Sequence, residues 1–221
     1  MSLFYEDEFV ELHHGDCRAV RGWTRADVLV TDPPYGIPGG RLSYHKGKPV
    51  HADAAEDPIA LRDEPLGIWG DRPRAVFGTP KTTAPAHRGM PLVWDKGDSP
   101  GMGDYTWPWG LSYELVYING DGWAGKRRGS VLRSNHSSSV ASRIGHPTPK
   151  PVGLMETLIS YAPPGLIADP FAGSGSTLIA ARNLGRKVIG VELEEKYCEL
   201  IVKRLSQQAF DFSALEGHRD A

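Results

Sequence analysis

The sequence predicts an α/β fold in which helices cover a mostly parallel β-sheet. Short apolar runs that end in turn residues recur along the 221 residues. The last third alternates between such runs and segments with helical periodicity. Several of the runs lack polar alternation, which is typical of strands buried on both faces. The length suits one domain, expected over residues 1–209, followed by a tail over residues 210–221 that we expect to be mobile.

Seven strands are expected, because β-branched and aromatic residues lie between turn-forming residues in each of them. They are Phe9–His14, Ala26–Thr31, Arg74–Gly78, Pro91–Trp94, Tyr113–Ile118, Gly165–Asp169 and Lys187–Glu192. Three helices are expected from apolar residues at helical spacing. They run from about Pro151 to Tyr161, from near Ser174 to Leu184 and from Glu194 to about Gln207. The loop-rich middle section gives no clear helix.

Composition limits the kinds of function. The net charge of −2 excludes a basic field over the whole surface, so any nucleic-acid contact must come from a local patch. Cys17 and Cys198 provide neither a disulfide framework nor a metal site, which favours a reducing interior. Residues 1–10 lack the apolar segment of a signal peptide, and no stretch is long enough to cross a membrane. We expect a soluble, cytoplasmic protein without a membrane partner or a metal.

A glycine-rich turn, Asp169–Thr177, lies where a strand gives way to a helix. Gly173 and Gly175 allow a tight turn and the close approach of a ligand, and the helix that follows offers free N–H groups. Glu192 ends the next strand, about 20 residues further on, where an acidic side chain commonly binds ribose hydroxyls. This combination predicts a cofactor that contains adenosine.

Two other nucleotide sites fit this turn poorly. A phosphate-binding P-loop needs lysine after the last glycine, but Ser176 follows Gly175. The dinucleotide pattern needs a third glycine, but position 178 is Leu178, which argues against an oxidoreductase. A tight turn without a ligand stays open as an alternative.

A second turn, Thr31–Gly36, also follows a buried strand. Pro33 and Pro34 fix the backbone and remove two N–H donors. What remains is a rigid set of acceptors beside the Asp32 carboxylate, with the ring of Tyr35 next in sequence. This arrangement suits a planar amino group on a ring that Tyr35 can stack against. A Pro-Pro turn that only ends a strand is the alternative.

Together, Asp-Pro-Pro-Tyr at 32–35 and Asp-Pro-Phe-Ala-Gly-Ser-Gly-Ser-Thr at 169–177 resemble the amino-methyltransferases that modify DNA. The catalytic motif comes first, as in the permuted, β-type arrangement of this family. Three further segments resemble family segments and follow in family order: His14–Cys17, Leu92–Gly97 and His146–Pro151. The resemblance extends from Phe9 to Leu205.

The resemblance implies a Rossmann-like methyltransferase fold, with a seven-stranded sheet, helices on both faces and an antiparallel hairpin at one edge. It implies S-adenosyl-L-methionine as cofactor and a base flipped out of double-stranded DNA as substrate. The catalytic residues would be Asp32, Pro33, Pro34 and Tyr35. The cofactor-binding residues would be Asp16, Cys17, Asp32, Lys150, Asp169, Phe171, Ala172, Gly173, Ser174, Gly175, Thr177, Glu192 and Leu193.

Asp32 favours adenine N6 as the target, because cytosine-directed relatives more often carry serine there and protein-amide relatives carry asparagine. Cytosine N4, RNA, a protein amide and a non-catalytic relative that only binds cofactor or DNA are the alternatives. The family also leaves a homodimer open.

A basic segment is the candidate DNA contact. From Gly122 to Met155 the chain has no Asp or Glu, a composition that favours phosphate contact, although a solvated loop is the alternative. This short target-recognition segment is expected over residues 120–149. A second group of cations follows the catalytic turn. The candidate DNA-binding residues are Arg41, Lys46, Lys48, Lys126, Arg127, Arg128, Arg133 and Arg143.

Overall fold

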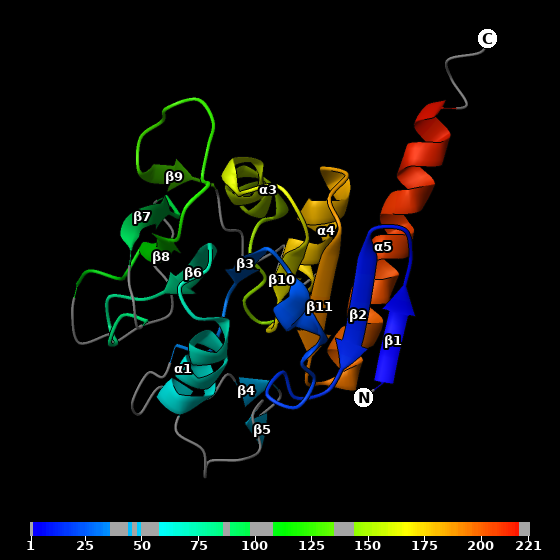
Figure 1. The fold of residues 1–221 in the computed structure, drawn as a ribbon, viewed down its shortest axis with the longest axis horizontal. Coiled ribbons are helices and arrows are strands. Elements are labelled where there is room, and N and C mark those ends of the chain that lie inside the picture. The colour runs from blue at the N-terminus through cyan, green and yellow to red at the C-terminus, as the bar shows by residue number, and fades with distance from the viewer. Residues whose placement is uncertain are drawn as a thin grey trace.

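A nine-stranded sheet organises the protein (Figure 1). The computed structural model describes residues 2–35, 44–45, 48–49, 58–85, 89–97, 108–134 and 144–216. In spatial order the strands are β1 (Ser2–Glu6), β2 (Val10–His14), β11 (Val188–Glu192), β10 (Ile167–Asp169), β3 (Val28–Thr31), β6 (Arg74–Gly78), β8 (Tyr113–Asn119), β7 (Met90–Asp95) and β9 (Val131–Arg133). A separate pair consists of β4 (Tyr44–His45) and β5 (Lys48–Pro49).

All seven expected strands are present, and they form the continuous centre of the sheet. The five strands from β2 to β6 are parallel to one another. β8 is antiparallel to both β6 and β7, which confirms the expected hairpin. The sheet also has two strands that we did not expect, one at each edge. β1 pairs with β2 through a turn in which the Asp7 carboxylate accepts hydrogen bonds from two backbone N–H groups, and β9 is only three residues long.

Helices cover both faces of the sheet, as expected. On one face lie α3 (Val152–Tyr161), α4 (Ser176–Asn183) and α5 (Glu195–Glu216). On the other lie the 3₁₀ helix η1 (Gly22–Arg25) and α1 (Pro58–Trp69).

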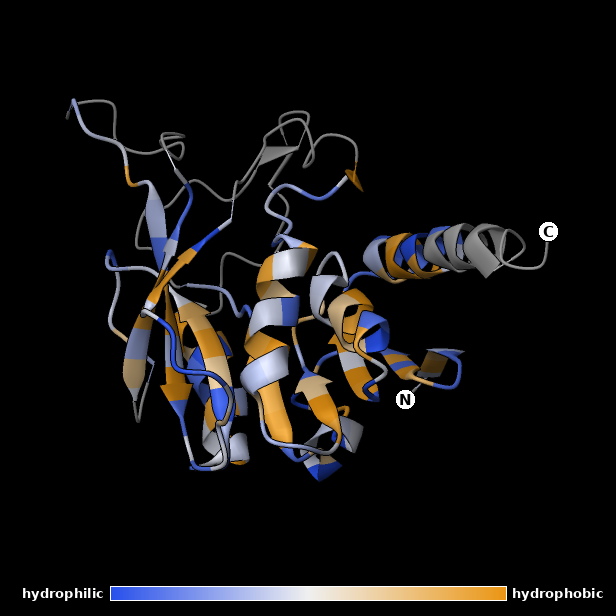
Figure 2. Ribbon diagram, turned by 90° about the horizontal axis from the view of Figure 1, so that it is seen from above, coloured by the Kyte–Doolittle hydropathy of each residue, from blue (hydrophilic) through white to orange (hydrophobic). Residues whose placement is uncertain are grey.

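A hydrophobic core lies on each face of the sheet, and alternating residues of β3 belong to different cores. Val28 and Val30 pack on the side of α3, and Leu29 packs on the side of η1. All three are fully buried, and each such side chain contributes about 1.5–3 kcal/mol on leaving water. Figure 2 shows apolar residues along these strands.

The helices differ from expectation at their ends for local reasons. α4 begins at Ser176 because Gly175, at φ 78°, adopts the left-handed conformation, which no helical residue has. α5 continues to Glu216, so the first part of the expected tail is helical, because no glycine or proline interrupts residues 208–216. We did not expect α1, since Pro65 and Gly67 within it obscure the helical pattern. No helix in the described part of the chain is long and apolar enough to span a membrane.

The core under α4 can be tested with one substitution. Leu178 is fully buried between α4 and the sheet, so Leu178→Ala should lower the free energy of unfolding by about 2–5 kcal/mol. Urea unfolding measures this change. The matched control is Leu184→Ala at the end of the same helix, where the side chain is 41% exposed and the loss should stay below about 0.5 kcal/mol. Equal losses in the two variants would contradict this packing.

Candidate active site

Strands β3 and β10 bring the two functional turns together. They are parallel neighbours, with Val28 beside Ile167 and Leu29 beside Ala168, so their carboxyl ends lie at the same edge of the sheet. A hydrogen bond joins these ends directly: the Thr31 hydroxyl donates to the Asp169 carboxylate at 2.6 Å. Ligands of open α/β sheets bind at this edge, which we call the catalytic edge.

The glycine turn after β10 has the close packing that the sequence predicts. Gly173 and Gly175 have φ angles of 52° and 78°, a region that favours glycine. A Cβ on Gly175 would lie 2.8 Å from Ile201 Cγ1, and one on Gly173 would lie 3.3 Å from His146 Nε2. The turn therefore has no room for a side chain at position 175 and little at position 173, and both φ angles favour glycine.

Glu192 lies beside this turn at the end of β11. Its carboxylate accepts hydrogen bonds from the N–H groups of Gly173, at 2.7 Å, and of Glu194, at 2.8 Å. Burial raises the pKa of Glu192 to about 7. The group is thus an acceptor next to the glycine turn, as binding to ribose hydroxyls requires, and its charge changes near neutral pH.

The end of β2 adds two residues of the expected cofactor set. The N–H of Gly15 donates to the Glu192 carbonyl at 2.8 Å, so residues 15–17 lie beside the end of β11. Hydrogen bonds from Arg18 fix the Asp16 carboxylate and lower its pKa. Burial raises the pKa of the Cys17 thiol to about 12, so this side chain is neutral and serves packing.

The remaining residues of that set lie around the glycine turn. Burial raises the pKa of Asp169 to about 6, against hydrogen bonds from Thr177, Thr31 and the N–H of Phe171. Ala172 and Ser174 are buried within the turn, and Leu193, after β11, is 61% exposed. The structure thus gathers these residues at one edge, and their contact with a cofactor stays a prediction.

The turn after β3, which we expect to be catalytic, is held by Tyr35 and by charged side chains. Tyr35 Oη donates a proton toward two carboxylates, with Asp32 Oδ1 at 2.8 Å and Glu114 Oε2 at 2.7 Å. The Lys150 ammonium pairs with Asp32 Oδ2 and lies 3.4 Å from Glu114 Oε2. Lys96 pairs with the other oxygen of Glu114. We call these five residues the ionic cluster.

Two carboxylates and two ammonium groups make the ionic cluster electrically balanced. Burial raises the pKa of Asp32, and the charge of Glu114 raises it further, against the effect of Lys150. Burial alone would raise the pKa of Glu114, but Lys150 and Lys96 lower it to about 2. Burial would lower the pKa of Lys150, but Asp32 and Glu114 raise it. Lys150 is therefore an ammonium ion, although its side chain is only 8% exposed.

Three aromatic rings surround the same ammonium group. Lys150 Nζ lies 5.1 Å from the ring centre of Phe77, 5.5 Å from that of Tyr35 and 5.9 Å from that of Trp94. The structure places Lys150 against Asp32, which is the residue shared by the expected catalytic and cofactor sets, and a contact between Lys150 and a cofactor stays a prediction.

Sequence reasoning missed Glu114 and Lys96 as site residues. Glu114 precedes a run of apolar residues in β8, and a charged residue in a strand that is otherwise apolar was the available signal. Its partner could not be inferred, because β8 reaches the site only through antiparallel pairing with β6 and β7.

The expected DNA contacts lie in different places. Arg133 is at the catalytic edge, since β9 pairs Arg133 with Asp95, which also pairs with Tyr113 at the start of β8. Its side chain is 85% exposed. Arg41, Lys46 and Arg143 lie outside the described residues, and for Lys48 in β5 only the backbone is described.

Three exposed cations lie beyond the far ends of the strands, on the side of the sheet opposite the catalytic edge. They are Lys126, Arg127 and Arg128. They follow β8, which runs away from the catalytic edge for seven residues, or about 20 Å. Tyr161, at the end of α3, holds their turn by donating to the Lys126 carbonyl at 2.8 Å. The structure therefore does not bring these cations to Asp32.

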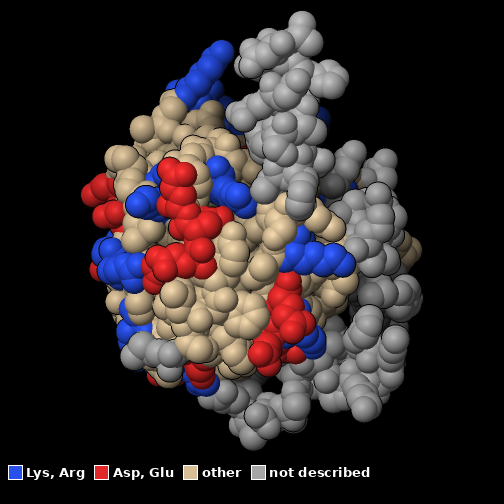
Figure 3. Space-filling view, turned by 90° about the vertical axis from the view of Figure 1, so that its right-hand side faces the viewer, with Lys and Arg blue, Asp and Glu red and all other residues tan. Residues whose placement is uncertain are grey.

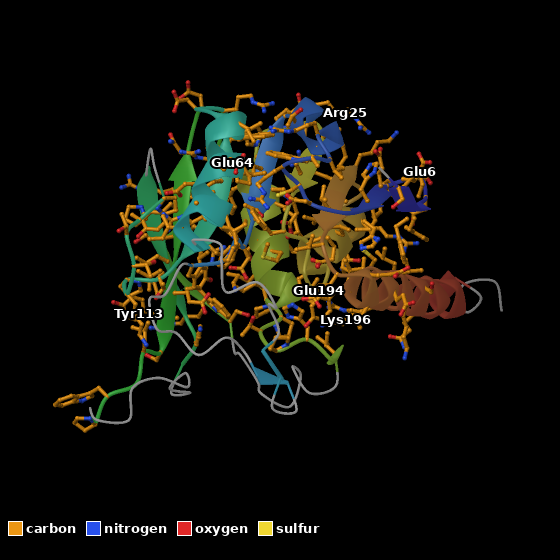
Figure 4. All side chains as sticks on the ribbon, turned by 90° about the horizontal axis from the view of Figure 1, so that it is seen from below. Glu6, Arg25, Glu64, Tyr113, Glu194 and Lys196 are labelled. Atoms are coloured by element: carbon orange, nitrogen blue, oxygen red, sulfur yellow. The ribbon has the colours of Figure 1, made fainter. Side chains whose placement is uncertain are left out.

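Figure 4 shows the two edges: Tyr113, Glu194 and Lys196 lie at one and Arg25 and Glu6 at the other. Figure 3 shows a face on which basic and acidic side chains are intermixed. That face has no basic field of one sign, in line with the net charge of −2.

The fold is that of S-adenosylmethionine-dependent DNA methyltransferases. The structure of the M1.HpyAVI–SAM complex matches with a TM-score of 0.59 at 20% identity, over 89% of this chain and 100% of that one. The PvuII DNA methyltransferase, which is cytosine-N4-specific, matches with a TM-score of 0.62 at 13% identity, over 90% of this chain and 87% of that one. At these identities the similarity establishes the fold.

Sequence comparison establishes the family. The profile of the DNA methylase family matches residues 63–203. Type II methyltransferase M2.LlaDCHI of Lactococcus lactis subsp. cremoris is 28% identical over an alignment of 251 residues, which covers 93% of each chain. The chain belongs to the N6/N4 DNA methyltransferases, enzymes that use S-adenosylmethionine as methyl donor.

Glu192 predicts a pH dependence of cofactor binding. Because its pKa is about 7, the Glu192 carboxylate, which we expect to accept from the ribose hydroxyls, becomes protonated as the pH falls below 7. The Kd for S-adenosylmethionine should rise about tenfold between pH 8 and pH 6. Isothermal titration calorimetry measures this change. Glu192→Gln should bind weakly at both pH values, and an equally steep pH dependence in that variant would assign the effect to another group.

Proposed function

We propose that this protein methylates the exocyclic amino group N6 of adenine in double-stranded DNA at specific sites. The observation that carries the proposal is the position of Asp32 and Tyr35 at the carboxyl end of β3, directly beside the glycine turn that follows β10. Cytosine N4 is the second candidate, since its amino group has the same local chemistry. Asp32 favours adenine, because cytosine-directed relatives more often carry serine there.

The chain provides acceptors for the two hydrogens of the amino group. These are the Asp32 carboxylate and the carbonyl beside Pro33, and accepting both hydrogens favours a pyramidal nitrogen with a free lone pair. The bound cofactor supplies a methyl group on a sulfonium sulfur, which leaves as a thioether. The nitrogen would form a bond to this methyl carbon as the sulfur–carbon bond breaks, and it would then lose one proton to water. Asp32 stabilises the positive charge that develops on the nitrogen.

Positioning is the main contribution of the protein to this step. Tyr35 offers an aromatic face for the base, and its hydroxyl is fixed by Asp32 and Glu114. Residues of the glycine turn, together with Asp16, Glu192 and Leu193, would hold the cofactor. The Asp32 side chain is 26% exposed at the edge of the sheet, so a base must leave the duplex stack to reach it.

The proposal is tested by identifying the methylated base. Purified protein is incubated with radiolabelled S-adenosylmethionine and unmethylated DNA, and the nucleosides are then separated. We expect label in N6-methyladenine. Label in N4-methylcytosine would replace the proposed base with the second candidate, and absence of label from DNA would overturn the proposal.

Asp32→Ala should abolish methyl transfer, with a fall in kcat of about 10³-fold or more, because it removes both acceptor and counter-charge. The Kd for S-adenosylmethionine should change by less than about threefold, since the glycine turn and Glu192 remain. A control is Glu156→Ala on α3, whose carboxylate accepts a hydrogen bond from Asn183 at the end of α4 that lies away from the catalytic edge. An equal loss of binding and transfer would count against Asp32 as a catalytic residue.

A further inference from the structure

Other members of the ionic cluster already contact both oxygens of Asp32, the carboxylate that the proposed function assigns to the amino group. Asp32 Oδ1 accepts from Tyr35, and Asp32 Oδ2 pairs with the Lys150 ammonium. If Asp32 acts as proposed, it must stabilise positive charge that develops on the amino nitrogen. An ammonium ion against the same carboxylate opposes that charge. Lys150 therefore has to leave Asp32 when the amino group arrives.

We propose that Glu114 is a positioning residue for methyl transfer, because it takes over the Lys150 ammonium when Asp32 accepts the amino group. This inference rests on the proposed function of Asp32. It adds to that function a second carboxylate which never touches the base and keeps the first one available to it.

The distances allow this exchange with little motion. Lys150 Nζ pairs with Asp32 Oδ2 and lies 3.4 Å from Glu114 Oε2, so it already stands between the two carboxylates, and rotation at the end of its side chain can bring it to a charged hydrogen bond of about 2.8 Å with Glu114 and away from Asp32. The backbone need not move, and the Ser176 hydroxyl fixes it by donating to the Lys150 carbonyl at 2.7 Å. Only the end of the lysine side chain has to change its position.

As Lys150 moves from Asp32 to Glu114, the hydroxyl proton of Tyr35 can turn from Glu114 to Asp32. The single phenol proton has two acceptors at nearly equal distances, 2.8 Å to Asp32 and 2.7 Å to Glu114. With Lys150 on Asp32, the proton is within reach of both carboxylates and can satisfy Glu114. With Lys150 on Glu114, the proton can turn to Asp32 Oδ1 and leave Asp32 Oδ2 for the amino group. Both arrangements satisfy all the charged groups, so the cluster has two states.

Glu114 is a rigid receiver because of where it lies. It is on β8, an interior strand of the sheet, opposite Trp94 of β7. Lys96 binds its other oxygen and keeps it charged. Because Glu114 is fixed and the Lys150 side chain is flexible, the ammonium group moves to the carboxylate and the carboxylate keeps its position.

Glu114→Gln tests the inference because it keeps the shape and removes the charge. Lys150 should then stay on Asp32, and kcat should fall by about ten- to a hundredfold while the Kd for S-adenosylmethionine changes by less than about threefold. The matched control is Glu11→Gln on β2, a carboxylate with similar burial that pairs with Arg25 and His13 away from the site. Equal effects of the two variants on kcat would overturn the inference.

A double-mutant cycle tests the route through Lys150. In a Lys150→Met background, Glu114→Gln should lower kcat by less than about twofold, because no ammonium is left to receive. If the full loss persists in that background, Glu114 does not act through Lys150 and the inference fails.

The pKa of Asp32 gives a measurement that needs no turnover. The charged or titratable groups that face Asp32 are Lys150, Glu114, Tyr35 and Asp169, and Glu114 raises its pKa. In Glu114→Gln the Asp32 pKa, followed by carbon NMR of its carboxyl group in the free protein, should fall. An unchanged value would overturn the exchange. If this shift appears while the wild-type protein methylates no base, the proposed function fails and the coupling of the cluster stands.

Discussion

The site depends on the parallel pairing of β3 with β10. Each strand ends in a turn that can do little alone, since Asp32 lies in one and the cofactor glycines lie in the other. The Thr31 hydroxyl donates a hydrogen bond of 2.6 Å to the Asp169 carboxylate and so joins the ends of the two strands. The two turns therefore keep one relative position. Methyl transfer needs two reactants held in line, and this pairing sets their separation before either ligand binds.

Charge balance is the second constraint on the site. A carboxylate in a half-buried position next to aromatic rings requires partners, because an isolated buried charge is strongly unfavourable. Lys150 and Lys96 supply them for Asp32 and Glu114. If Asp32 acts as proposed, the Lys150 ammonium competes with the substrate amino group for the same carboxylate, and the proposed transfer of Lys150 to Glu114 keeps every charged group paired.

The sequence predicted the elements better than their partners. The strands and the glycine turn follow from local pattern, because β-branched runs, Gly173 and Gly175 act within a few residues. Glu114 and Lys96 could not be assigned, since their role comes from pairing between strands far apart in sequence. The turn at Lys126–Arg128 shows the same limit: its charge suggested a contact with DNA, but the direction of β8 places it at the edge opposite Asp32. Arg133, from the same basic segment, lies at the catalytic edge.

The order of strands along the chain has a consequence for how the enzyme is made. Thr31 and Asp169 touch in space but are separated by 138 positions in sequence, and β2 pairs with β11 near the other end of the described chain. During synthesis, the amino-terminal strands must wait for partners that the ribosome adds late. Contacts of such long range form slowly and leave strand edges open meanwhile. The nascent chain therefore cannot complete its catalytic edge until β11 has left the ribosome, which places the onset of activity after the synthesis of that strand.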